Sequence, residues 1–176
     1  MSPALVKIDV VSALLGLPVK KVHALVDESY FGNRGFAWVF NLALDPQGER
    51  KDLRWWWPEI QARMSPDAKE NRRYAFYQLE WVINRIVPGN RPHYPSGEVD
   101  RLFQISPQTR IRLHAEFFGP AETAHCDVPG NLPQGGSLYP RTALVEFLER
   151  RWIQNLKKSV NQPKILTTTE NYAHAQ

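Results

Sequence analysis

Few side chains in this sequence have the types and the spacing that enzyme chemistry requires. One polar group, formed by His114, His125, Cys126 and Asp127, could in principle pair a cysteine nucleophile with a histidine base. Three of these residues fall in the Gly- and Pro-rich stretch 119–137, which predicts a long loop. The sequence has no Gly-rich phosphate loop and no nucleophile elbow. We therefore expect no catalytic residues and a chain that is not an enzyme.

Metal and disulfide chemistry are also poorly supported. Cys126 is the only cysteine, which excludes an internal disulfide. Its neighbours His125 and Asp127 lack the paired spacing of a zinc site. We expect no metal site and no other cofactor.

The composition is that of a chain that folds. Of 176 residues 43% are apolar, which excludes wholesale disorder, and 22 Lys and Arg against 18 Asp and Glu give a net charge of +4. So small an excess fits nucleic-acid binding but is common in other cytosolic proteins. No apolar run reaches the ~18–20 residues that cross a bilayer, and the first residues lack the features of a secretion signal. We expect a cytoplasmic protein with no membrane partner.

The first half of the chain predicts two short helices and a β-hairpin. One helix runs from about Asp9 to Leu15 and ends at Gly16, and a second begins near Pro18. The buried side of the second helix is expected to hold four residues, Val19, Val22, Leu25 and Val26. Alternating apolar residues around a turn at 45–48 predict a hairpin over 36–57, and a short helix follows over 59–64.

Three consecutive tryptophans end the predicted hairpin. Trp55 and Trp57 are expected to point into the core. Alternation then sends Trp56 to the opposite face, either to the surface or against the other half of the chain.

The sequence Ser65-Pro66-Asp67 has a cap, a first-turn proline and an acidic residue, a typical helix start. It predicts a long central helix from about Pro66 to Ile86. Residues 88–92 then break the chain before a second half with helices over 96–103, after Ser106-Pro107 and from Pro140, and a short strand at 138–139.

The two halves resemble each other in sequence. LLGLPVKKVHAL (14–25) aligns with LFQISPQTRIRL (102–113) at a shift of 88, and Trp57-Pro58 aligns with Tyr139-Pro140 at a shift of 82. These matches predict a diverged tandem duplication. Arg110 falls opposite the core residue Val22, so we expect Ile111, with Leu113 and Phe117, to supply the buried side of the second copy.

SGEVDRLFQISPQTRIRL (96–113) and SLYPRTALVEFLERRW (137–152) together resemble the winged helix-turn-helix of the excisionase and MerR-like regulators. VVSALLGLPVKKVHALV (10–26) with WWWPEI (55–60) looks like a more degenerate copy. The resemblance implies an α+β, mainly helical fold with two winged helix-turn-helix modules joined by a long central helix. The expected divisions are 1–64, 65–91, 92–159 and a polar tail at 160–176. The loop over 119–137 is longer than the compact wing of that family.

If the second helix of each copy is a recognition helix, its first turn should carry donors for base edges and phosphates. The first copy offers Lys20, Lys21 and His23, and the second offers Gln108, Thr109, Arg110 and Arg112. The hairpin, as a wing, would lay Arg34, Arg50, Lys51 and Arg54 along a phosphate backbone. The alternative is that these residues are solvated helix faces and a hydrophilic turn over the core.

By this resemblance we expect a sequence-specific double-stranded DNA-binding protein, a transcriptional regulator or an excisionase-like recombination accessory factor. Its two recognition helices would enter successive major grooves about 34 Å apart. The alternative is a protein-protein interaction subunit, an inhibitor or a homo-oligomer in which the winged helices are a scaffold. DNA binding is favoured if Lys20, Lys21, Arg110 and Arg112 share one surface. The interaction protein is favoured if these cations point apart, or if they pair with Glu28, Glu98 and Asp100.

Overall fold

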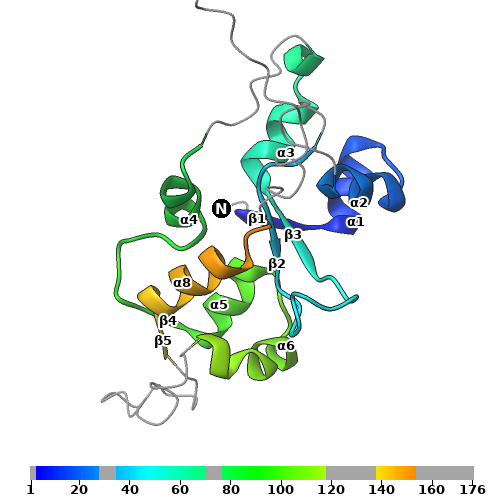
Figure 1. The fold of residues 1–176 in the computed structure, drawn as a ribbon. Coiled ribbons are helices and arrows are strands. Elements are labelled where there is room, and N and C mark those ends of the chain that lie inside the picture. The colour runs from blue at the N-terminus through cyan, green and yellow to red at the C-terminus, as the bar shows by residue number, and fades with distance from the viewer. Residues whose placement is uncertain (1–2, 28–34, 70–76, 118–137, 154–176) are drawn as a thin grey trace, which may run out of the picture.

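The computed structural model describes residues 3–27, 35–69, 77–117 and 138–153. In these residues the fold is α+β, mainly helical, with small antiparallel sheets (Figure 1). The expected loop at 119–137 and tail at 160–176 lie outside the described residues. No helix of the described residues is long and apolar enough to span a membrane.

The first half forms a three-stranded sheet with helices around it. Its elements are β1 (Leu5–Lys7), α1 (Ile8–Leu15), α2 (Val19–Asp27), β2 (Val39–Asn41), β3 (Leu53–Trp56) and α3 (Trp57–Met64). The strand order is β1-β3-β2, and β3 pairs antiparallel with both neighbours. The predicted hairpin is confirmed. On α2, Val22, Leu25 and Val26 are buried as predicted, whereas Val19 is 44% exposed because it lies in the first turn.

The second half has the same order of elements without the hairpin. It contains β4 (His93–Pro95), α5 (Ser96–Phe103), α6 (Pro107–Arg112), β5 (Leu138–Pro140) and α8 (Arg141–Arg151). Strands β4 and β5 pair antiparallel, with Tyr94 opposite Tyr139. The predicted helix over 96–103 is confirmed, and a short helical segment at 114–117 follows α6.

The two tight turns between helices have the same backbone geometry. Gly16 and Gln104, 88 residues apart, both adopt the left-handed conformation, with φ of 62° and 51°. The next amides donate to equivalent carbonyls, Leu17 N to Ser12 O (3.1 Å) and Ile105 N to Asp100 O (3.0 Å). At this turn, residues 88 positions apart are structurally equivalent, as the predicted alignment has them.

The predicted shift of 82 for the later part of each half is wrong. Val6 pairs with Trp55, and its counterpart Tyr94 pairs with Tyr139, which gives a shift of 84. Helices α3 and α8 begin at Trp57 and Arg141, again 84 residues apart. Aligning the aromatic-proline pairs placed the two sequences two residues out of register.

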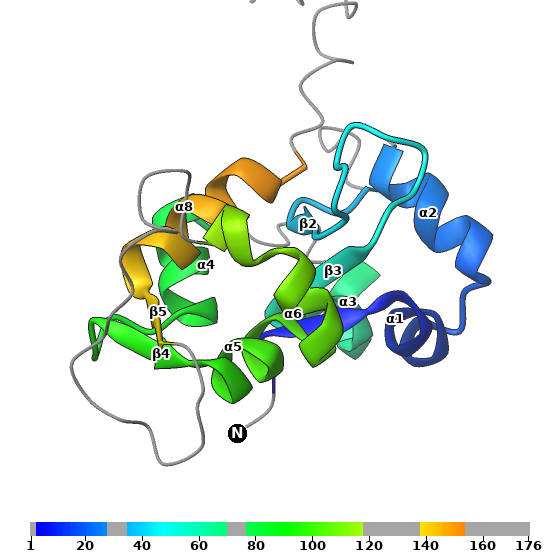
Figure 2. The same ribbon diagram turned by 90° about the horizontal axis from the view of Figure 1, so that it is seen from below.

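A shared core joins the two halves. The larger apolar cluster combines hairpin residues such as Trp38, Phe40 and Trp56 with Phe103 and Phe147 of the second half. The helices of the two halves lie on opposite sides of the hairpin in both views (Figures 1 and 2). The end of α8 reaches the edge strand β2: Trp152 stacks on Trp38 at 4.5 Å and Ile153 N donates to Val39 O at 2.8 Å.

The predicted long helix from Pro66 to Ile86 is wrong. The described residues of this segment form a short 3₁₀ helix, η2 (Pro66–Lys69), and a separate helix, α4 (Leu79–Ile86). Gln78 is extended (φ −71°, ψ 142°), so Tyr77 lies outside α4 and still stacks on Trp81 at 4.8 Å. The start signal at Ser65-Pro66-Asp67 is therefore followed by a single short 3₁₀ turn, and the helix that ends at Ile86 begins separately at Leu79.

Trp56 lies between the two halves, the second of the two predicted positions. It is fully buried and meets Trp81 edge-on at 5.4 Å, while Trp55 is buried in the first half and Trp57, the first residue of α3, is only half-buried. Both faces of β3 are covered because α1 and α3 pack on one side and the second half on the other. A buried Trp56 is unavailable for stacking on a nucleic-acid base.

Candidate functional site

Helix α6 presents a short polar face to solvent. Its N-cap is Ser106, whose Oγ accepts the Thr109 N–H at 3.1 Å, and Pro107 occupies the first turn. Gln108 and Arg112 are exposed. Ile111, predicted to be buried, is 65% exposed, so α6 carries an apolar side chain beside its polar ones.

Arg110 fills the core position expected for Ile111. Its Nε lies 2.7 Å from Asp100 Oδ1, its Nη1 donates to Tyr139 Oη at 3.1 Å, and only 14% of the side chain is exposed. Tyr139 Oη also lies 3.1 Å from Nδ1 of His114. Arg110 thus packs inside the second half, at the position that Val22 occupies in the first, and its contact with DNA stays a prediction that this arrangement does not favour.

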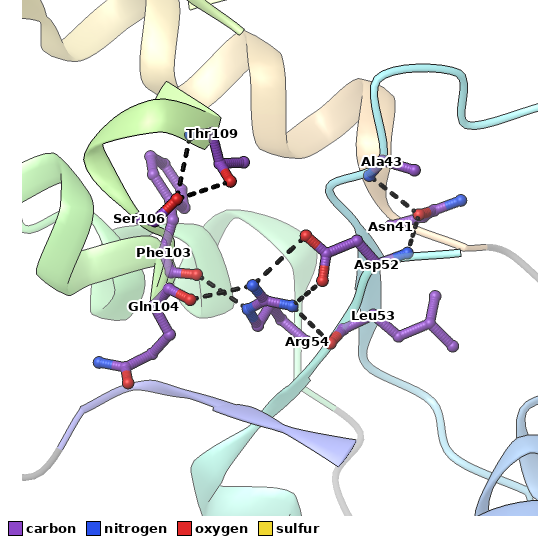
Figure 3. A network of polar contacts seen from close by, with 9 residues as sticks. All are labelled: Asn41, Ala43, Asp52, Leu53, Arg54, Phe103, Gln104, Ser106 and Thr109. Carbon is purple, nitrogen blue, oxygen red and sulfur yellow. Dashed lines mark hydrogen bonds and ion pairs between the residues drawn. The ribbon is translucent and has the colours of Figure 1, made fainter. Parts of the chain in front are cut away.

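Arg54, predicted to contact phosphate on the hairpin, is also a structural residue. It is 4% exposed, and its guanidinium donates to Phe103 O (3.0 Å), Gln104 O (2.9 Å) and Leu53 O (3.0 Å) (Figure 3). It also pairs with Asp52. Arg54 is therefore almost fully buried between β3 and the α5–α6 turn, where it also borders an open hollow.

Asn41 organises the hairpin loop that carries Asp52. Its Oδ1 accepts the amides of Ala43 and Asp52, both at 3.1 Å (Figure 3). Its Nδ2 donates to Pro46 O at 3.2 Å. The same amide side chain thus joins the two arms of the hairpin and orients the residue that pairs with Arg54.

Two open hollows are bordered by five of the remaining candidates: His23 of α2, Arg50 and Lys51 of the hairpin, and Thr109 and Arg112 of α6. The first, of about 370 Å³, is bordered by the end of β1, by His23 of α2, by Lys51 of the hairpin and by Ser106 and Thr109 of α6. The second, of about 740 Å³, lies between the hairpin loop and α6. Viewed as in Figure 2, α6 lies in the middle of this region, with α1 and α2 on one side. We define the composite surface by eight exposed or half-exposed residues: six that border these hollows (Lys7, His23, Arg50, Lys51, Thr109 and Arg112) and two exposed residues of α6 that border neither (Gln108 and Ile111).

The charge of the composite surface is mixed. Asp9, Asp45, Glu49 and Asp52 border the same hollows. Asp52 is neutralised by Arg54, and Lys51 Nζ is 3.7 Å from Asp27 Oδ1. The basic residues come from three places: Lys7 from β1, Arg50 and Lys51 from the hairpin loop, and Arg112 from α6.

Lys20 and Lys21 are exposed on α2 but line neither hollow. Arg34, Glu28 and the group His125, Cys126 and Asp127 lie outside the described residues. In the part of the chain that the structure describes, no cluster of three His, Cys, Asp or Glu residues is placed to hold a metal.

Two buried ionic residues were missed by sequence reasoning. Arg151, at the end of α8, is 4% exposed and donates to Ala43 O of the hairpin and to Glu116. Glu59 of α3 is fully buried. Its carboxylate accepts hydrogen bonds from the amides of Ala37 (2.9 Å) and Trp38 (3.1 Å) and forms an ion pair with Arg63. Burial raises the pKa of the Glu59 carboxyl against the opposing effects of Arg63 and the two amides. The i,i+4 spacing of Glu59 and Arg63 was the one signal available in the sequence.

The chain matches no known protein family, no curated relative and no solved structure.

Proposed function

We propose that this protein binds double-stranded DNA through the composite surface, with α6 as the reading helix. The observation that carries the proposal is the position of α6: exposed Arg112 borders the same hollow as Arg50 and Lys51 of the hairpin loop, and exposed Gln108 lies one turn earlier on the same helix. Arg and Gln pair bidentately with guanine and adenine edges, and lysine suits phosphate as a point charge. Exposed Ile111 is suited to contact a thymine methyl group.

The order of elements supports this proposal. Strand β1, two helices joined by a tight turn, and a hairpin in a sheet of order β1-β3-β2 follow the winged helix-turn-helix plan expected from the resemblance. The second half has the same strand, helix, turn and helix, followed by β5 and α8. On this plan the hairpin loop acts as a wing against phosphate. A role as transcriptional regulator or recombination accessory factor follows from the resemblance.

The composite surface favours one contiguous binding site over two sites in successive grooves. His23 of α2 and Thr109 of α6 border the same hollow of about 370 Å³. Facing residues of one such hollow are much closer than the roughly 34 Å between successive major grooves. The proposal therefore has α6 in a major groove, with the hairpin loop and α2 against the flanking backbone.

A protein-interaction role is the second candidate, and the arginines favour it. Arg110 pairs with Asp100, which is the pairing expected of an interaction protein, and Arg54 is buried. Glu98, by contrast, pairs with Arg91. Trp81 of α4, 44% exposed, stacks with Tyr77 and borders neither hollow, so it offers a protein an aromatic contact outside the composite surface.

Selection from a random pool of duplex DNA at two salt concentrations tests the proposal, because salt separates base reading from general attraction to a basic protein. We expect one enriched contiguous motif. Arg112→Ala should weaken binding to it by about 1–3 kcal/mol. The matched control is Arg85→Ala, an exposed arginine of α4 that borders neither hollow, which should leave the affinity unchanged. Weak binding without enrichment, abolished by salt, would reject DNA reading and favour a protein partner.

A further inference from the structure

The turn between α5 and α6 has a backbone conformation that its sequence does not favour. Gln104 has φ of 51°, and among the described residues it is the one non-glycine residue with positive φ. The β-carbon of an L-residue makes this region unfavourable, and such residues persist where surrounding contacts hold them. The direction in which α6 leaves α5 depends on this residue, because α6 begins three residues later.

Arg54 of β3 holds this turn from the other half of the chain. Its Nε donates to Phe103 O at 3.0 Å and its Nη2 to Gln104 O at 2.9 Å (Figure 3). These carbonyls stand at the end of α5, where a helix has no partners of its own for its last carbonyl groups. The planar guanidinium satisfies both at once, which a lysine ammonium does not do with the same geometry.

The hairpin fixes Arg54 in turn. Nη1 donates to Leu53 O at 3.0 Å and pairs with Asp52, whose own amide is held by Asn41 Oδ1. Asp52 and Lys51 belong to the loop that borders α6. A continuous set of hydrogen bonds therefore runs from the hairpin loop, through Arg54, to the turn that precedes α6.

We propose that Arg54 is a positioning residue: through Phe103 O and Gln104 O, the hairpin of the first half sets the orientation of α6. The consequence for DNA rests on the proposed function: the base preference of α6 then depends on Arg54, which itself reads no base. The two halves then read a site as one rigid unit.

Hydrogen exchange without DNA tests the orientation of α6. The chain provides internal controls at the shift of 88: the amides of Ile105 and Arg110 are bonded as those of Leu17 and Val22 are, at 3.0–3.1 Å. In Arg54→Met we expect Ile105 and Arg110 to exchange at least tenfold faster, with Leu17 and Val22 unchanged. Arg151→Met is the matched variant, since Arg151 is equally buried and also joins the halves but does not touch the turn. Arg151→Met should not make the amides of Ile105 and Arg110 exchange faster than those of Leu17 and Val22.

The base-preference arm uses selection on duplex DNA with the same variants. Arg54→Met should change the order of preferred bases in the enriched motif and leave the salt dependence of binding as in the wild type. A role in stability alone would lower occupancy with the preferences intact, and a direct phosphate contact would reduce the salt slope by about one. Either result would overturn the inference.

Two further outcomes separate the inference from the proposed function. If the wild type selects no DNA motif, the proposed function fails, while the exchange experiment still decides whether Arg54 orients α6. Equal acceleration at all four amides would reject the positioning role even if DNA binds. Should Arg54→Met not fold, Arg54→Lys keeps the charge, and we expect the same difference in exchange at a reduced size.

Discussion

In each half a tight turn of the same backbone conformation joins two helices, but different side chains stabilise it. In the first half the left-handed position is Gly16, the turn is closed locally by Ser12 Oγ donating to Leu17 O at 2.6 Å, and the inner side of α2 is the apolar Val22. In the second half the equivalents of Gly16 and Val22 are Gln104 and Arg110.

Each polar replacement in the second half is matched by a partner. Asp100, at the position equivalent to Ser12, pairs with Arg110, and Arg54 binds the carbonyl of Gln104. The first-half turn depends on its own residues, whereas the second-half turn depends on contacts from β3 and β5. A backbone shape can thus be kept while its stabilisation moves from local, apolar contacts to long-range, polar ones.

The largest expected effect comes from breaking the Asp100–Arg110 pair. Arg110→Val, which copies the first half at one position, leaves Asp100 with 14% of its side chain exposed and no cation. We expect a loss of about 3 kcal/mol in the free energy of unfolding, measured by urea denaturation. The double variant Asp100→Ser/Arg110→Val copies the first half at both positions and should recover most of the loss. Equal instability of the single and double variants would show that the pair does not replace Val22 in this way.

Local signals explain why much of the fold could be predicted from sequence. Gly16, Pro58, Ser106 and Pro107 mark helix ends through backbone preferences that act within a few residues, and the structure places helix ends there. The composite surface could be predicted in part for the same reason, since Gln108 and Arg112 are set by the start of α6.

The roles of the arginines could not be predicted, because their partners are distant in sequence. Arg54 binds carbonyls 49 and 50 residues away, and Arg151 binds one 108 residues away. An arginine on a polar hairpin has the same local pattern whether it faces solvent or crosses to another element. The break before α4 was also missed, and the extended Gln78 lies next to Tyr77, which packs on Trp56, a residue more than 20 positions earlier in the chain.

The halves also differ in the helix that follows the sheet, and this difference predicts a pH dependence. Glu59 of α3 is buried, and its counterpart at the shift of 84 is Ala143 of α8. The pKa of Glu59 is raised above its ordinary value of 4.5 by burial. Between 4.5 and the raised pKa the native state holds a proton that the unfolded state has released, so this group makes stability fall as pH rises through that window.

Glu59→Gln removes that titration while keeping one amide acceptor for Ala37 or Trp38. We expect a change of about 1 kcal/mol in the free energy of unfolding, with the variant gaining on the wild type as pH rises above 4.5. Urea denaturation of both proteins at several pH values measures it. A constant difference across the series would mean that Glu59 does not titrate in that window.

The smallest effects concern the two left-handed residues themselves. A β-carbon added at Gly16 meets nothing within 4 Å, so Gly16→Gln tests the backbone conformation free of steric contacts. It should cost about 1 kcal/mol, because no arginine among the described residues of the first half binds this turn as Arg54 binds the other. Gln104→Gly relieves the same conformation but loses the bond from Gln104 Nε2 to Arg101 O (2.9 Å) and gives the unfolded chain more freedom. Its net effect on the free energy of unfolding should therefore be below about 0.5 kcal/mol. Thermal unfolding of both variants measures the asymmetry; a cost at Gln104 as large as that at Gly16 would mean that the two turns are held in the same way after all.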